Sequence, residues 1–199
     1  MTSDLWYNWP MRFLAVMLAL AAVTPSAVFA DEEIGFDRWY AGAAGGMSMP
    51  GSGNTLRRAG AVAVRGGWYA SEFTAFEIEG LCAPNMSSGV GNTTLSAVSA
   101  RGVFHMTGWD AFDKLFGCER FDPFLTAGVT AHFASRHAFA DGDHRTGIGP
   151  AAGLGAFWHI TDSISLRVDA SATLCVDSPC GMMYGVFAGI QVSLGGGTP

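Results

Sequence analysis

The sequence predicts an all-β fold, an eight-stranded antiparallel up-and-down transmembrane β-barrel that follows a signal peptide. Three observations predict it. Hydrophobic residues recur at every second position in runs of about ten residues, as in strands with two unlike faces. Alternately short and long polar connections separate these runs. Charged residues are only 14% of the 199 residues, below the about 25% of soluble domains.

The overall charge excludes two classes of protein. The 11 basic and 17 acidic residues give a formal net charge of −6, so the chain lacks the basic surface of a nucleic-acid-binding protein. A hydrophobic share of 49% gives the chain ample apolar surface to bury, which excludes intrinsic disorder.

The N-terminal segment has the composition of a secretory signal peptide. A positive charge at Arg12 precedes an apolar run that ends in Val-Phe-Ala and is followed by acidic residues, which predicts cleavage after Ala30. The run is shorter than the about 20 residues of a membrane-spanning helix, so a membrane anchor is the weaker interpretation. We therefore expect a signal peptide at 1–30 and a barrel domain at 31–199. Met11 is an alternative start of the chain.

The predicted strands follow one another along the whole barrel domain. Alternation is clearest in Ile164–Leu174, where even-numbered positions are apolar and odd-numbered positions are polar or charged. The eight strands are expected at Arg38–Met47, Ala59–Tyr69, Phe73–Leu81, Leu95–Met106, Phe124–Ala134, Ile148–Ile160, Ile164–Leu174 and Gly181–Leu194.

The connections predict which end of the barrel faces the periplasm. Ala70–Glu72 and Thr161–Ser163 are tight turns, whereas the connections at the opposite end are longer and polar. In outer-membrane barrels the short turns are periplasmic. Thr107–Asp122 is the exception, a long connection on the short-turn side that we expect to contain a helical turn. The longer polar connections are Ser48–Arg58, Cys82–Thr94 and Ser135–Gly147.

Charged residues on the polar faces are expected to fill the interior. The shortest turn between the second and third strands places Arg65 opposite Glu77, and a turn one step longer places it opposite Glu79. The turn at Thr161–Ser163 places Gly155 opposite Asp169. The expected interior polar layer consists of Arg65, Glu77, Glu79, Arg101, Arg167 and Asp169.

Aromatic residues lie near the strand ends on the apolar faces. Trp68, Phe104 and Trp158 are expected at the periplasmic end, and Phe133 and Tyr184 at the other. Such belts are typical of the two membrane interfaces, although aromatic residues of an ordinary core are an alternative.

Three segments carry a resemblance to a known family: PFLTAGVTAHF, GPAAGLGAFWHITDSISLRVDASATL and YGVFAGIQVSLGG. With these segments the chain resembles the small eight-stranded outer-membrane β-barrels, the OmpA-like or porin-like family. The resemblance implies insertion into the outer membrane of a Gram-negative-type cell and an interior filled by side chains. The partners we expect are the lipid bilayer and the outer-membrane assembly machinery, with the protein a monomer.

The four cysteines allow more than one pairing. Cys175 and Cys180 bracket a short loop, which predicts a disulfide in an exported protein. Cys82 is an alternative partner for either residue. Cys118 lies in the connection at the opposite end, so it is not expected to pair with Cys82.

Residues that could support metal binding or catalysis form no specific motif. His137, Asp141, Asp143 and His144 share one loop, but their spacing matches no known ligand set, so we expect no metal and no cofactor. His132 with Ser135 and His159 with Thr161 are the nearest approaches to a base and a nucleophile. His132 and Ser135 lie on opposite faces of a strand, and no acidic residue is near His159 in the sequence.

These observations favour a non-enzymatic outer-membrane barrel that is structural or interacts with partners through its outer loops. The alternatives are a small-solute porin, a soluble lipocalin-like carrier and an outer-membrane lipid-modifying enzyme.

Overall fold

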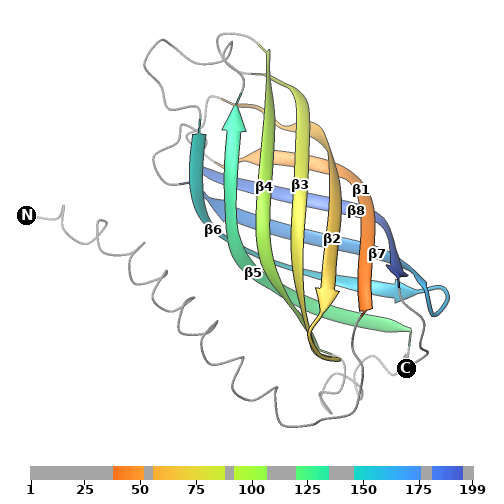
Figure 1. Cartoon of the computed structure of the whole chain (residues 1–199). Coiled ribbons are helices and arrows are strands. Elements are labelled where there is room, and N and C mark those ends of the chain that lie inside the picture. Colours follow the sequence, from red (N-terminus) through yellow and green to blue (C-terminus); the bar gives the residue numbers. More distant parts are fainter. Residues whose placement is uncertain are drawn as a thin grey trace, which may run out of the picture. The chain divides into compact units, whose positions relative to one another are not determined.

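Eight antiparallel strands close into a barrel in the computed structural model (Figure 1). The structure describes residues 38–51, 56–87, 92–106, 120–134, 146–175 and 181–194. The strands are β1 (Arg38–Pro50), β2 (Ala59–Tyr69), β3 (Thr74–Ser87), β4 (Asn92–His105), β5 (Phe121–Ala134), β6 (Thr146–His159), β7 (Ile164–Leu174) and β8 (Met182–Leu194).

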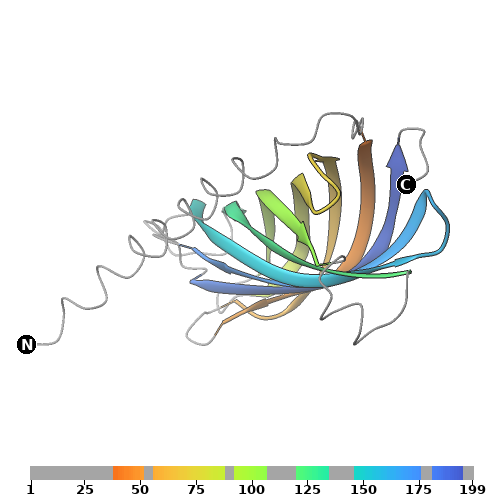
Figure 2. The same ribbon diagram turned by 90° about the horizontal axis from the view of Figure 1, so that it is seen from below.

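Every strand pairs with its neighbours in the chain, and β1 also pairs with β8, which closes the sheet. Figure 2 shows the strands curving around a common interior. This arrangement confirms the predicted fold class and the number of strands. In the part of the chain that the structure describes, no helix is long and apolar enough to cross a membrane.

The two faces of the sheet differ sharply in polarity. On β7, Val168 is 55% exposed on the outer face, whereas Arg167 beside it is 2% exposed in the interior. A soluble barrel has the opposite distribution, with its apolar face inward. The 11 residues of β7 rise about 3.4 Å each and tilt by about 40°, so its apolar face covers a height of about 26 Å. That height matches the apolar band of an outer-membrane barrel.

The registers of the last two hairpins are those that the sequence predicts. Gly155 lies opposite Asp169 between β6 and β7, and Leu174 lies opposite Met182 between β7 and β8. Ile160 donates its N–H to the carbonyl of Ile164 at 2.9 Å, which closes the turn between β6 and β7.

The register of β2 and β3 differs from the shortest-turn prediction, because Arg65 lies opposite Glu79 and not opposite Glu77. Ala70 donates its N–H to the carbonyl of Thr74 at 2.9 Å, which moves Phe73 from the strand into the turn. The Ser71 hydroxyl accepts a hydrogen bond from the N–H of Phe73 at 3.2 Å. A hydroxyl that satisfies the turn backbone in this way stabilises the longer connection.

The same bonding stabilises the turn between β6 and β7. There the Thr161 hydroxyl accepts from the N–H groups of Ser163 and Ile164 at 3.3 and 3.1 Å. In both turns the second residue carries a hydroxyl and the third is acidic, in Ser71-Glu72 and in Thr161-Asp162.

Several predicted connections are shorter than expected, most clearly those after β3 and before β5. β3 continues to Ser87, so Cys82 lies within the strand and on its outer face. The strand passes an irregularity between Ala83 and Met86, where Pro84 ends the regular alternation. β5 begins at Phe121, so Asp122 belongs to the strand and faces the interior. The expected helical turn at residues 107–119 lies outside the described residues.

The interior contains two apolar clusters. One includes Tyr40, Phe124 and Phe157 in the half nearer the short turns. The other includes Met86 and Phe187 in the half nearer the longer connections. Charged side chains occupy the space between them.

A glycine allows one of the interior rings to fit. A Cβ atom on Gly155 would lie 2.5 Å from Cζ of Phe124, 2.5 Å from the carbonyl oxygen of Val168 and 2.8 Å from Cβ of Asp169. Gly155→Ala is therefore expected to lower the free energy of unfolding by about 1–3 kcal/mol. Gly45→Ala is the matched control, because its Cβ would meet nothing within 4 Å. Equal urea midpoints for the two variants would contradict this packing.

Aromatic side chains form a belt on the outer surface at the short-turn end. Trp68 stacks on Phe76 with ring centroids 5.8 Å apart, and Phe121 contacts Trp158 edge-on at 6.3 Å. Trp39 lies opposite Trp68 on the neighbouring strand. Amphipathic rings favour the membrane interface, so this belt is expected at one face of the bilayer.

Candidate functional site

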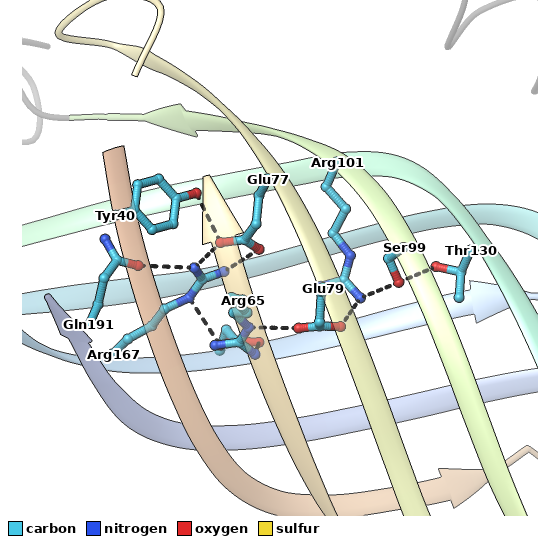
Figure 3. A network of polar contacts seen from close by, with 10 residues as sticks. Tyr40, Arg65, Glu77, Glu79, Ser99, Arg101, Thr130, Arg167 and Gln191 are labelled. Atoms are coloured by element: carbon cyan, nitrogen blue, oxygen red, sulfur yellow. Dashed lines mark hydrogen bonds and ion pairs between the residues drawn. The ribbon is translucent and has the colours of Figure 1, made fainter. Parts of the chain in front are cut away.

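A network of three arginines and three carboxylates crosses the middle of the barrel interior (Figure 3). The residues come from β2, β3, β4 and β7, whose alternation directs every second side chain inward. All of them are buried. They are Arg65, Glu77, Glu79, Arg101, Arg167 and Asp169.

Arg167 is the most enclosed of the arginines. Its guanidinium forms a two-pronged ion pair with Glu77, in which Nη1 contacts Oε2 and Nη2 donates to Oε1 at 3.2 Å. Its Nε donates to Asp169 at 3.2 Å. The guanidinium carbon lies 4.7 Å from the ring centroid of Phe124 and 5.3 Å from that of Phe157. A planar guanidinium can bind both carboxylates and stack on rings, which an ammonium group cannot do.

The second half of the network joins Arg65, Glu79 and Arg101. Arg65 Nε donates to Glu79 Oε2 at 2.6 Å, and Arg101 Nη2 donates to Glu79 Oε1 at 2.6 Å. Arg65 also pairs with Asp169, with 2.9 Å between Nη1 and Oδ1. Because Asp169 contacts both Arg65 and Arg167, the six residues form one connected group.

Neutral side chains extend the network to further strands. Tyr40 on β1 donates its hydroxyl to Glu77 at 3.0 Å, and Arg167 donates to Gln191 on β8 at 3.4 Å. On the opposite side, Arg101 donates to the Ser99 hydroxyl at 3.2 Å, and Ser99 bonds Thr130 on β5 at 2.8 Å. The network therefore reaches from the β1–β8 side of the lumen to β5.

The charges within the network balance, with three positive and three negative side chains. A buried charge is costly to desolvate unless it is paired and hydrogen-bonded, and here each charge has a partner of opposite sign. The six charges therefore neutralise one another inside the barrel.

The structure brings all six expected polar residues together, and of the two partners predicted for Arg65 the shortest-turn one, Glu77, is wrong. Glu79 is the carboxylate that bonds Arg65, because β2 and β3 are paired in the longer register. Glu77 pairs instead with Arg167 from β7.

A second polar cluster, whose residues are not among the predicted site residues, lies at the short-turn end. His105 Nδ1 lies 2.5 Å from Asp122 Oδ2, and His159 Nδ1 lies 2.8 Å from the Ser165 hydroxyl. His159 Nε2 is 3.9 Å from Asp122 Oδ2, too far for a hydrogen bond. The sequence predicts that the fifth strand begins at Phe124, which leaves Asp122 in the connection. Because the strand begins at Phe121, Asp122 falls on its inward face.

The second cluster joins a serine, two histidines and an aspartate near the short turns. Ser165 is only 6% exposed, and Asp122 is engaged by His105. The cluster pairs polar groups at the short-turn end, although His105 Nε2 has no hydrogen-bond partner among the described residues. Thr161, the residue considered as a partner of His159, accepts hydrogen bonds from the turn backbone.

Several predicted residues lie outside the described part of the chain. Cys175 is buried just after β7, but Cys180 lies outside, so their disulfide stays a prediction. Cys118, Ser135 and the loop with His137, Asp141, Asp143 and His144 also lie outside. Within the described ranges, no group of three or more His, Cys, Asp or Glu side chains is placed to hold a metal ion.

The chain is similar to solved structures of other proteins, but not to any family profile or curated sequence. No protein-family profile matches the sequence, and no curated protein does. Neisserial surface protein A matches with a TM-score of 0.58 and 14% identity, covering 78% of this chain and 95% of that one. The outer membrane protein OprG from Pseudomonas aeruginosa matches with a TM-score of 0.58 and 8% identity, covering 80% and 97%. The attachment invasion locus protein Ail of Yersinia pestis matches with a TM-score of 0.52 and 10% identity, covering 79% and 97%.

The chain has the fold of the small outer-membrane β-barrels. The match covers almost the whole length of each of these proteins. At such low identity it establishes the architecture, and the outward apolar face of this barrel agrees with it. Side-chain roles must come from this chain's own geometry.

Proposed function

We propose that the chain is a non-enzymatic outer-membrane β-barrel that serves as a structural or surface-interacting protein through the connections at its longer-loop end. The observation that carries this proposal is the ion network across the lumen. A barrel with paired charges across its interior is a rigid support. On such a support, the residues that bind partners are found mostly on the loops.

The outer surface supports a lipid bilayer as the principal partner. Apolar side chains such as Ile78, Leu154 and Val168 are more than half exposed, so in water they would form an extensive apolar surface. A bilayer would cover that surface. Insertion by the outer-membrane assembly machinery and a monomeric state belong to the same proposal, because a closed barrel leaves no sheet edge to pair with another copy.

The porin alternative requires an open path for solutes through the network. Two ion pairs join strands that are not neighbours in the sheet: Arg167 on β7 pairs with Glu77 on β3, and Asp169 on β7 pairs with Arg65 on β2. A solute that enters the lumen would meet these cross-lumen pairs. Separating buried pairs without replacement partners is costly. The network therefore favours a closed barrel over a solute pore.

Surface labelling of intact cells tests the proposed topology. An epitope inserted at Asp141, in a longer connection, is expected to bind antibody on intact cells. The same epitope inserted at Asp162, in the tight turn of β6 and β7, is expected to bind only after the outer membrane is permeabilised. Binding at Asp162 but not at Asp141 on intact cells would contradict the proposed use of the longer loops.

Export is a further prediction of this proposal. The protein extracted from membranes is expected to begin at Asp31, because the apolar run ends in the small residue Ala30. Intact-mass measurement checks this. A mature protein that retains the segment from Arg12 to Ala30 would contradict it.

A further inference from the structure

The unexplained feature of the interior is a histidine without hydrogen bonds. His132 on β5 is 6% exposed and faces the lumen on the longer-loop side of the ion network. Neither its Nδ1 nor its Nε2 has a hydrogen-bond partner among the described residues. Arg101 has the same deficit at Nε, although its Nη2 is bonded to Glu79 and Ser99. Buried polar atoms are nearly always satisfied by protein or by ordered water.

These unsatisfied groups line one cavity. Its volume is about 20 Å³, and His132 and Arg101 share it with Glu79, Ser99, Thr130 and Thr173. A polar cavity of about 10–15 Å³ is enough for one water molecule. The cavity is thus polar and large enough to hold water.

Charge and hydrogen-bond capacity select water over an ion. Arg101 and Glu79 both line the cavity, but their charges already neutralise each other in an ion pair of 2.6 Å. A neutral imidazole offers one donor and one acceptor, and Arg101 Nε offers one donor. An anion would use the donors only and would meet the carboxylate, whereas water can accept from Arg101 and donate to the imidazole.

We propose that this cavity is a binding site for at least one ordered water molecule, which bridges His132 and Arg101. The water completes the hydrogen bonding of the ion network on its longer-loop side. It also makes this part of the lumen a hydrated pocket that ends at the Arg101–Glu79 pair. This inference concerns the interior and goes beyond the proposed surface role.

Oxygen-17 magnetic relaxation dispersion of the folded protein in detergent counts long-lived internal waters and tests this site. His132→Phe, which removes both nitrogens and fills the cavity, is expected to lose at least one such water. Ala131→Phe is the matched control, because its side chain points to the outer face of the same strand, and it should keep the wild-type count. Equal counts in the wild type and His132→Phe would overturn the proposal.

A crystal structure of the wild type gives a test that does not depend on folding of the variant. We expect an electron-density peak within hydrogen-bond distance of both a His132 ring nitrogen and Arg101 Nε. An empty cavity would overturn the proposal. So would an anomalous peak at this position after soaking in bromide, because the site would then bind an anion.

Discussion

Arg167→Met is expected to lower the free energy of unfolding by about 3–5 kcal/mol. The substitution leaves the Glu77 carboxylate buried without its ion-pair partner, and Tyr40 alone still donates to it. Asp169 keeps its pair with Arg65, so the loss of unfolding free energy should come mainly from the unpaired Glu77 carboxylate. Urea titration of the refolded barrel, followed by the change in gel mobility on unfolding, measures the midpoint.

A double variant separates loss of the pair from loss of packing. Combining Arg167→Met with Glu77→Leu removes both charges. The double variant should therefore lose less unfolding free energy than the sum of the losses in the two single variants. A buried ion pair replaced on both sides by apolar residues is often tolerated. Strict additivity of the two losses would show that Arg167 and Glu77 are not coupled.

Val168→Arg is expected to lower the free energy of unfolding by about 2–4 kcal/mol, because Val168 lies at the middle of the apolar outer face of β7. The cost of arginine on a lipid-facing surface depends on depth. Leu174→Arg is the matched control, on the same face but at the end of the strand, where about 0–1 kcal/mol is expected. Refolding into lipid vesicles with urea titration measures both.

Spin labels on β7 provide an independent check of the same claim. A label at position 168 should be relaxed by oxygen, which partitions into lipid, and not by a water-soluble reagent. A label at position 168 that responds only to the water-soluble reagent would reverse the assignment of the two faces.

The sequence was sufficient to predict the strands and their faces, because alternation at every second residue reports burial directly. The registers around β7 followed from the turn at Thr161–Ser163 and were correct. For β2 and β3 the sequence leaves two registers open, and the shorter one is wrong because Phe73 belongs to the turn and not to the strand. The Ser71-Glu72 and Thr161-Asp162 sequences are alike, and treating both turns in the same way would have placed Arg65 opposite Glu79.

The members of the interior network could be predicted, but most of its contacts could not. Position on the inward face identifies each charged residue, and strand pairing identifies sheet neighbours such as Arg65 and Glu79. Arg167 and Glu77 belong to β7 and β3, which are not neighbours in the sheet. Their contact crosses the lumen, so it depends on how the barrel closes and on how far the side chains reach. The register of a hairpin relates only neighbouring strands and cannot predict such a contact.

Single-channel conductance in planar lipid bilayers tests the closed-barrel account most directly. Arg65→Ala combined with Glu79→Ala removes an ion pair from the lumen, whereas Val64→Ala with Ile78→Ala removes side chains from the outer face of the same strands. We expect the wild type and the outer-face control to conduct little and the lumen variant to conduct measurably more. Large and equal conductance in the wild type and the lumen variant would contradict the closed barrel and favour the porin alternative.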